Sequence, residues 1–177
     1  MRFDYIIIGA GSAGCVLSNR LTENPNNKVA VVGSGEPKEN ETDKLFSGKK
    51  VILFAVPGAF TPTCNNSHLP SFLEIYDQIK EKGIDNVVCL SVNDQFVSKA
   101  WRDNNKSIKN DFLFIADGNG EITESLGMTL DCSSFGMGKR SNRYVMIVEN
   151  KLVKKLIVEE NPGTCDLTNA NEILKFI

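Results

Sequence analysis

Residues 51–64 read Val-Ile-Leu-Phe-Ala-Val-Pro-Gly-Ala-Phe-Thr-Pro-Thr-Cys, and this stretch decides the fold. Its first six residues form an apolar, β-prone run that predicts a strand. A loop over Pro57–Pro62 follows. Apolar residues then recur at helical spacing and predict a helix over Thr63–Lys82, which ends at Gly83. Pro70 inside this helix is expected to kink it.

Strands and helices alternate along the chain on both sides of this stretch. The pattern predicts an α/β fold in which helices flank a central mixed β-sheet. Two short strands are predicted before it, over Phe3–Ile8 and Lys28–Val32, with a polar loop over Gly33–Lys44. The elements predicted after it are strands Asn86–Val92 and Phe112–Ala116, helices Asp94–Asn104 and Ile122–Leu126, a loop Asp131–Asn142, a hairpin of Tyr144–Glu149 with Leu152–Val158, and a closing helix Ala170–Ile177.

The composition excludes several classes of function. The net charge is −2, which argues against a nucleic-acid-binding protein because such a protein needs a basic stripe. The longest apolar stretches, near Tyr5–Ala10 and Val51–Val56, are too short to span a bilayer. Asp4 and an interrupting glycine argue against an export signal. We therefore expect no membrane partner and a cytoplasmic location.

The five cysteines are widely spaced and include no C-x-x-C pair. His68 is the only histidine, so the clustered ligands that a zinc site needs are missing from the sequence. Dispersed cysteines in a reducing compartment are either small buried residues or redox-active thiols. The cysteines are Cys15, Cys64, Cys89, Cys132 and Cys165.

The loop before Cys64 has the residues that thiolate chemistry requires. Thr61 is a good N-cap and Pro62 suits the first helical position, so Cys64 falls in the first helical turn. Free N–H groups and the helix dipole there favour a negatively charged sulfur. A thiolate can attack the O–O bond of a hydroperoxide, forming a sulfenic acid and releasing water or an alcohol. The leaving oxygen needs donors, such as the Thr61 hydroxyl, backbone N–H groups and an arginine.

These residues resemble the type II/type 5 peroxiredoxins over roughly residues 28–177. The family resemblance implies a thioredoxin-like fold, a homodimer, and reduction of hydrogen peroxide and alkyl hydroperoxides by an external thiol. It implies that Pro57 shields the pocket, that Thr61 hydrogen-bonds Cys64 and the peroxide, and that Arg143 stabilises the thiolate and the transition state. The matching motifs are Pro57–Cys64, His68-Leu69-Pro70, Val88–Asp94, Ala100-Trp101 and Gly138–Tyr144.

Other polar residues near these motifs have alternative roles. His68 lies one turn after Cys64 on the same helix face, so it could activate the thiolate. A structural or indirect role is favoured, because the peroxidase motif is complete without a base. Lys139 and Arg140 are expected to be solvated loop charges.

The sulfenic acid must be reduced, either by a second cysteine or directly by an outside thiol. Cys89 ends an apolar strand, and the resemblance to plant-like members makes it a possible resolving cysteine. Cys165 lies in a polar loop, in the region from which animal-type members resolve. Cys132 is expected in a flexible loop. A one-cysteine cycle with glutathione or glutaredoxin is favoured, with thioredoxin as the other possible reductant and Cys165 as the second choice of mechanism.

The N-terminal motif Gly9-x-Gly11-x-x-Gly14 follows a strand and opens a helix, as a dinucleotide-binding fingerprint does. Residues 3 to about 31 resemble the FAD-binding start of the glucose-methanol-choline oxidoreductases. The second strand, however, ends at Gly33 and lacks the ribose-binding acid, since Glu36 comes too late. We therefore expect residues 1–27 to be a non-functional fragment, residues 28–177 to be the peroxiredoxin domain, and no bound cofactor.

Two rivals to the peroxidase remain open at this point. One is a flavin-binding oxidoreductase fragment built on the glycine motif. The other is a non-enzymatic redox sensor, in which oxidation of Cys64 alters the binding of a partner.

Overall fold

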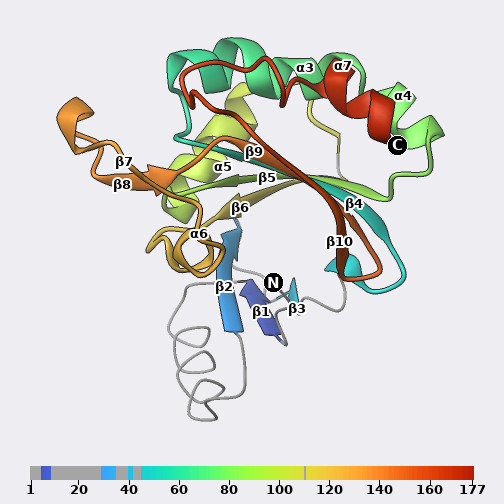
Figure 1. Ribbon diagram of the computed structural model, residues 1–177, viewed down its shortest axis with the longest axis horizontal. Helices are drawn as coiled ribbons and strands as arrows, with labels where there is room; N and C mark the ends of the chain where they lie inside the picture. The colour runs from blue at the N-terminus through green and yellow to red at the C-terminus, as the bar shows by residue number, and fades with distance from the viewer. Residues whose placement is uncertain (1–4, 9–28, 35–39, 42–44, 110) are drawn as a thin grey trace.

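The computed structural model describes the backbone of residues 5–8, 29–34 and 40–41, and both backbone and side chains of residues 45–109 and 111–177. Its centre is an eight-stranded mixed sheet with the strand order β10-β9-β4-β5-β6-β2-β1-β3 (Figure 1). The strands are β1 (Tyr5–Ile8), β2 (Val29–Ser34), β3 (Asn40–Glu41), β4 (Lys50–Val56), β5 (Asn86–Ser91), β6 (Phe112–Ala116), β7 (Thr129–Asp131), β8 (Lys139–Ser141), β9 (Tyr144–Glu149) and β10 (Leu152–Val158).

The middle of the sheet is built from the alternating strands and helices that the sequence predicted. Strands β4, β5 and β6 are parallel neighbours, and β9 lies antiparallel on the other side of β4. Strand β10 returns from β9 as a hairpin, as predicted. The turn residues Asn150 and Lys151 both adopt positive φ angles, 46° and 68°, which is the geometry of a tight hairpin turn.

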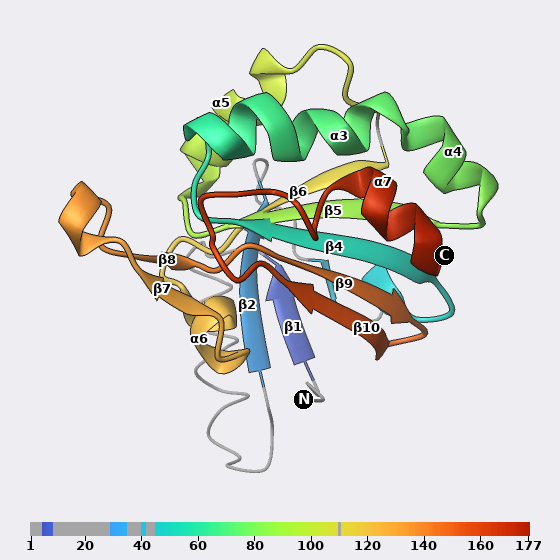
Figure 2. The same cartoon turned by 45° about the horizontal axis from the view of Figure 1, so that its top comes forward.

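Helices cover both faces of this sheet unequally. Helices α3, α4 and α7 lie along one face, and α6 lies below the opposite face (Figures 1 and 2). The helical segments are η1 (Cys64–His68), α3 (Leu69–Glu74), α4 (Tyr76–Glu81), α5 (Gln95–Asn104), α6 (Glu121–Ser125), η2 (Ser133–Phe135), α7 (Ala170–Ile173) and η3 (Leu174–Phe176). None of the helices in the described part of the chain is long and apolar enough to cross a membrane.

Two hydrophobic clusters result from the alternation of side chains along β4. Ile52, Phe54 and Val56 face the larger cluster, which also contains Cys64 and Cys89. Their neighbours along the strand face the smaller cluster on the α6 side. Because successive strand residues point to opposite faces, one apolar run supplies both layers of the core.

The predicted helix over 63–82 is instead a series of shorter segments. One break lies at Ile75, with φ −107° and ψ 16°, and the kink expected at Pro70 stays a prediction. Pro70 follows a π-turn in which the Leu69 N–H donates to the Cys64 carbonyl five residues earlier. Pro70 then lies in the first turn of α3, where a missing N–H is tolerated.

Smaller elements occur in two segments that the sequence predicted to be loops. The loop over 131–142 contains η2 and most of the β7–β8 hairpin, and the polar loop over 33–44 contains β3. Strand β1 pairs in parallel with β2, which pairs with β6, so it continues the sheet. The glycines of the N-terminal motif, Cys15 and Glu36 lie outside the described residues, and the division at residue 27 stays a prediction.

Candidate active site

The segment after β4 places Cys64 at the start of a helix, as predicted. Pro57 lies buried directly after the strand, and the chain enters the helical conformation at Pro62. The Asn65 N–H donates to the Thr61 carbonyl at 2.9 Å, which closes the first turn around Cys64. Cys64 itself has no exposed surface. Its sulfur therefore lies in a water-excluded position near the free N–H groups of a helix start.

Arg143, which is 79 positions from Cys64 in the sequence, brings a positive charge to this sulfur. Its Nη2 donates to the Cys64 Sγ at 3.4 Å, and its side chain is only 1% exposed. Arg143 immediately precedes β9, which is the antiparallel neighbour of β4, so the sheet itself brings the two residues together. Nε and Nη2 also donate to the Pro162 carbonyl at 3.1 and 3.0 Å, which fixes the plane of the guanidinium.

His68 completes the surroundings of Arg143 as a neutral acceptor. Its Nδ1 lies 3.0 Å from Arg143 Nη1, and its Nε2 lies 3.1 Å from the Thr168 carbonyl oxygen. A guanidinium only donates and a carbonyl only accepts, so Nδ1 must be bare and Nε2 must carry the proton. Burial, together with the Arg143 charge, lowers the pKa of His68 to about 3. An imidazole with both nitrogens engaged in this way orients Arg143 and has no lone pair left for the Cys64 thiol.

Thr61 occupies the predicted place but makes a different contact. Its hydroxyl donates to the Gly58 carbonyl at 2.8 Å, and among the described residues it makes no hydrogen bond to Cys64. Because the hydroxyl proton goes to Gly58, the Thr61 oxygen can still accept a hydrogen bond. Thr61 is three residues before Cys64 in the sequence. The bond to Gly58 stabilises the tight turn in which Phe60 adopts a positive φ of 61°.

Trp101 also contributes to the site, although the sequence pattern assigned it no role there. Its indole Nε1 donates to Asn65 Oδ1 at 2.8 Å, which ties α5 to the residue immediately after Cys64. Trp101 is fully buried, and the centroid of its ring lies 6.3 Å from the centroid of the Phe60 ring. The Ala100-Trp101 pair was visible in the sequence, but its partner belongs to another helix and could not be inferred from spacing.

The two possible resolving cysteines differ in their surroundings. Cys89 is buried in β5 within the same cluster as Cys64, and burial raises its pKa well above the usual value for a thiol. Cys165 is half-buried in the loop after β10, where its Sγ lies 3.8 Å from the Thr168 Oγ1. Burial also raises the pKa of Cys165. Cys132, predicted in a flexible loop, is buried with its pKa raised by burial. All four described cysteines are free thiols.

Arg140, predicted to be a solvated loop charge, is half-buried and hydrogen-bonded. Its Nε donates to the Met137 carbonyl and its Nη1 to the Val92 carbonyl, both at 2.8 Å. These contacts hold the β8 strand against the segment after β5. Lys139 is exposed, as predicted.

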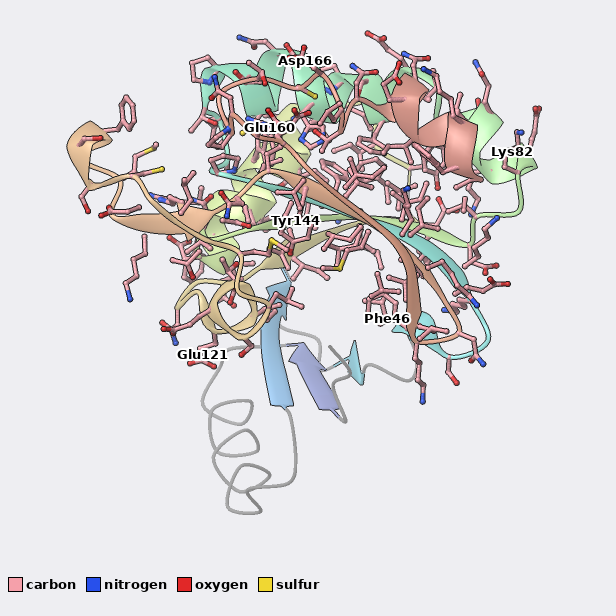
Figure 3. The ribbon with its side chains drawn as sticks, in the orientation of Figure 1. Phe46, Lys82, Glu121, Tyr144, Glu160 and Asp166 are labelled. Atoms are coloured by element: carbon pink, nitrogen blue, oxygen red, sulfur yellow. The ribbon has the colours of Figure 1, made fainter. Side chains whose placement is uncertain are left out.

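The loop between β10 and α7 closes over the site. Figure 3 labels Glu160 and Asp166 in this segment, which runs from the end of β10 to the helical layer. Besides the Pro162 and Thr168 carbonyls, it supplies the Gly163 carbonyl, which accepts a hydrogen bond from the Thr63 hydroxyl at 2.7 Å. The loop is therefore linked to the helix start, to His68 and to Arg143.

This arrangement suits nucleophilic attack by sulfur on an electrophilic oxygen. A cationic donor and the helix start both favour negative charge at one buried point, where electrostatic effects are stronger than in water. Among the residues that the structure describes, no three His, Cys, Asp or Glu side chains lie close enough to hold a metal ion.

Comparison with known proteins gives a consistent match. The Redoxin family model matches residues 22–174. The chain is 48% identical over 136 residues to peroxiredoxin-2D of Arabidopsis thaliana, which covers 75% of this chain and 81% of that protein. It is 46% identical over 138 residues to the hybrid peroxiredoxin hyPrx5 of Haemophilus influenzae, which covers 77% of this chain but only 56% of that protein.

A solved structure agrees with the sequence match. The crystal structure of reduced Prx3 from Vibrio vulnificus in complex with hydrogen peroxide is 43% identical and superposes with a TM-score of 0.75, covering 82% of this chain and 91% of that one. The fold is thioredoxin-like, as predicted. These matches lend no support to the flavoprotein resemblance of residues 3–31. The chain belongs to the Redoxin family and, within it, to the peroxiredoxins.

Proposed function

We propose that this peroxiredoxin reduces hydrogen peroxide and small alkyl hydroperoxides with Cys64 as the attacking thiolate. The observation that carries this proposal is the buried Arg143 guanidinium, whose Nη2 lies 3.4 Å from the Cys64 sulfur. A buried thiol with a fixed cation beside it is a reactive thiol rather than an inert core residue.

In the chemical step, the sulfur attacks the nearer oxygen of the peroxide while the O–O bond breaks. Cys64 becomes a sulfenic acid, and the departing oxygen leaves as water or an alcohol after taking a proton. Arg143 stabilises the negative charge on sulfur and then on the leaving oxygen. In this proposal, Thr61 and the backbone N–H groups of the first turn bind the peroxide, and Pro57 shields the sulfur from water.

The burial of Cys64 supports small substrates. Because the sulfur has no exposed surface, a peroxide reaches it only through a small shift of the surrounding residues. Such a movement admits hydrogen peroxide more easily than a bulky lipid peroxide. The Prx3 structure, which is described as a complex with hydrogen peroxide, supports the same substrate class.

The reductant in this proposal is an external thiol, glutathione with glutaredoxin, and thioredoxin is the alternative. Cys89 is fully enclosed and Cys165 is half-buried, and burial raises the pKa of both thiols. A protonated thiol is a poor attacker of a sulfenic acid. These surroundings favour a one-cysteine cycle, with Cys165 as the better placed of the two because it is partly accessible.

Further parts of the proposal concern the chain as a whole. We propose that it acts as a homodimer in the cytoplasm and needs neither FAD nor another cofactor. Residues 1–27 then contribute no catalysis, and residues 28–177 form the functional domain. Light scattering on the purified chain measures its oligomeric state, and an absorption spectrum without a flavin band agrees with the absence of FAD.

The decisive experiment follows peroxide consumption by the wild type and by Cys64→Ser, with glutathione and glutaredoxin supplied. We expect turnover by the wild type and none by the variant. Thioredoxin replaces glutaredoxin in a second series to identify the reductant. If the wild type forms no sulfenic acid when mixed with peroxide, the proposed function is wrong.

A further inference from the structure

Glu159 is a buried acidic residue that the reaction does not use directly. It follows β10 and is only 5% exposed. Its Oε1 accepts three hydrogen bonds, from the N–H groups of Leu167 and Thr168, both at 2.7 Å, and from the Thr168 hydroxyl at 2.9 Å. A carboxylate is buried in a protein only where such donors compensate for its lost hydration.

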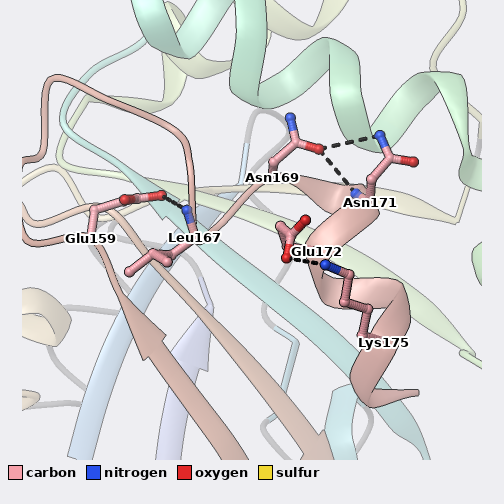
Figure 4. A network of polar contacts seen from close by, with 6 residues as sticks. All are labelled: Glu159, Leu167, Asn169, Asn171, Glu172 and Lys175. Carbon is pink, nitrogen blue, oxygen red and sulfur yellow. Dashed lines mark hydrogen bonds and ion pairs between the residues drawn. The ribbon is translucent and has the colours of Figure 1, made fainter.

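These bonds close a short loop, because they join residues eight and nine positions apart. Figure 4 shows the Glu159 carboxylate reaching across to Leu167, just before the chain enters α7. The far end of the loop continues through Asn169, whose side chain caps α7 by accepting from the Asn171 N–H at 3.0 Å. Ala170 and Ile173 anchor that helix in the core. Glu159 is thus the clamp that holds the loop against this fixed end.

The clamped loop carries the carbonyl groups that orient the active-site side chains. The Pro162 carbonyl accepts two hydrogen bonds from the Arg143 guanidinium, and the Thr168 carbonyl accepts one from His68. The backbone N–H of Glu159 also donates to the Arg143 carbonyl at 3.0 Å. Arg143 is therefore held through both its main chain and its side chain by the segment that Glu159 closes.

Thr168 links this clamp to Cys165 as well. The Thr168 hydroxyl has a single proton, which goes to the Glu159 carboxylate. The Cys165 thiol must then be the donor in its 3.8 Å contact with the Thr168 oxygen. The Glu159 carboxylate therefore accepts from both the N–H and the hydroxyl of Thr168, and it thereby sets which atom is the donor in the Cys165 contact. The Thr168 carbonyl is left to accept from His68.

We propose that Glu159 is a positioning residue, which aligns Arg143 on Cys64 through the Pro162 and Thr168 carbonyls. This inference rests on the proposed peroxidase function. The length of the Glu159 side chain matters, because its carboxylate bridges the end of β10 to the N–H groups of Leu167 and Thr168. Among the described residues it makes no hydrogen bond to Cys64. Loss of the clamp lets both carbonyls move, and the guanidinium follows them away from the sulfur.

Three substitutions of Glu159 distinguish the effect of its side-chain length from the effect of its negative charge. Glu159→Ala removes the clamp, and Glu159→Asp keeps the charge but is too short to bridge the gap. Glu159→Gln keeps an oxygen acceptor at the original distance. The matched control is Glu160→Ala, which removes the neighbouring exposed carboxylate. Thermal melts establish that each variant is folded before it is assayed.

Two rates are measured for each variant in the full-length chain. The first is the oxidation of Cys64 by hydrogen peroxide, followed by the fluorescence of Trp101, which is the only tryptophan and contacts the residue after Cys64. The second is the alkylation of Cys64 by iodoacetamide across pH, in a background in which Cys15, Cys89 and Cys132 are replaced by Ala and Cys165 by Ser. Alkylation needs a thiolate but no aligned peroxide, so it detects general unfolding or loss of thiolate.

We expect the Ala and Asp variants to lose roughly 10- to 100-fold in the peroxide rate, because a displacement of about 1 Å has such effects. The alkylation rate at high pH, where the sulfur is charged in every variant, should change far less, and both rates of Glu159→Gln and of the Glu160→Ala control should stay close to the wild type. Equal peroxide rates for Glu159→Ala and wild type would overturn the role of Glu159. So would parallel losses in the peroxide rate and in the high-pH alkylation rate, or a loss in Glu159→Gln that Glu159→Asp escapes. A wild type that fails to react with peroxide would instead overturn the proposed function itself.

Discussion

The first turn after β4 and the middle of β5 each hold a cysteine, and the two are alike in burial. Cys64 is 0% exposed and Cys89 is 1% exposed, and both belong to one hydrophobic cluster. Their polar surroundings differ. Cys64 receives a hydrogen bond from Arg143 at the start of a helix, whereas the Cys89 backbone is used up in the pairing of β5 with β4 and β6.

We infer from this difference that burial alone does not decide whether a thiol is reactive. Burial raises the pKa of Cys89, because a charged sulfur in an apolar strand has no donor to stabilise it. At Cys64 the helix start and the guanidinium supply those donors at the same depth. The four expectations that follow test this contrast, beginning with the largest effect.

Removing the cation should make Cys64 resemble Cys89. In Arg143→Met, we expect the rate of Cys64 oxidation by hydrogen peroxide to fall about 10²- to 10³-fold, as for the loss of one oxyanion donor. Stopped-flow fluorescence of Trp101 measures the rate. Arg140→Met serves as the control, because among the described residues Arg140 donates to the Met137 and Val92 carbonyls and not to Cys64. An unchanged rate in Arg143→Met would contradict the assigned role.

The neutral state of His68 should appear in the pH dependence of stability. Burial and the Arg143 charge lower its folded-state pKa from 6.5 to about 3, so between these values the unfolded chain binds more protons than the folded chain. The contribution of neutral His68 to the free energy of unfolding is therefore complete above about pH 6.5, and it is lost as the pH falls toward 3.

Urea unfolding at pH 7.5 and pH 5.0 measures this loss, which we expect to be about 2 kcal/mol for the wild type. His68→Gln cannot titrate and should lose less stability than the wild type over the same interval. Because His68 is the only histidine, the comparison isolates one group. Equal pH slopes for the two proteins would show that the imidazole is not held neutral.

Cys89 should matter for stability and not for chemistry. In Cys89→Ser, a hydroxyl enters an apolar position, and we expect the free energy of unfolding to fall by about 1 to 2 kcal/mol. Cys89→Ala is the control for volume. Urea unfolding measures the effect, and the rate of Cys64 oxidation should stay unchanged in both variants. A loss of thiol-dependent turnover with intact oxidation would instead identify Cys89 as the resolving cysteine.

The smallest effect is expected at Cys165. In Cys165→Ser, the hydroxyl can still donate to Thr168, so the loop over the site should persist. We expect steady-state turnover with glutathione and glutaredoxin to stay within about twofold of the wild type, as for most substitutions that leave packing intact. A much larger loss, accompanied by a disulfide in the oxidised wild type, would show a two-cysteine cycle.

Several elements could be predicted because their signals are local. The apolar run of β4, the helical spacing after it and the Asn150-Lys151 turn each depend on a few consecutive residues. Asp94, at the start of the predicted helix, caps α5 by accepting from the N–H groups of Phe96 and Val97. The break at Ile75 and the β7–β8 hairpin were missed, since packing rather than local preference sets them.

The sequence by itself determined the fold class, the location of Cys64 at a helix start, and the match to the peroxiredoxins, because strand, cap and helix signals are carried by neighbouring residues. Only the tertiary structure decided the contacts of Arg143 with His68 and Pro162, the bond between Thr61 and Gly58, and the clamp at Glu159. Those contacts join residues up to 75 positions apart. His68 and Arg143 become neighbours only when β9 pairs with β4, which no local pattern specifies.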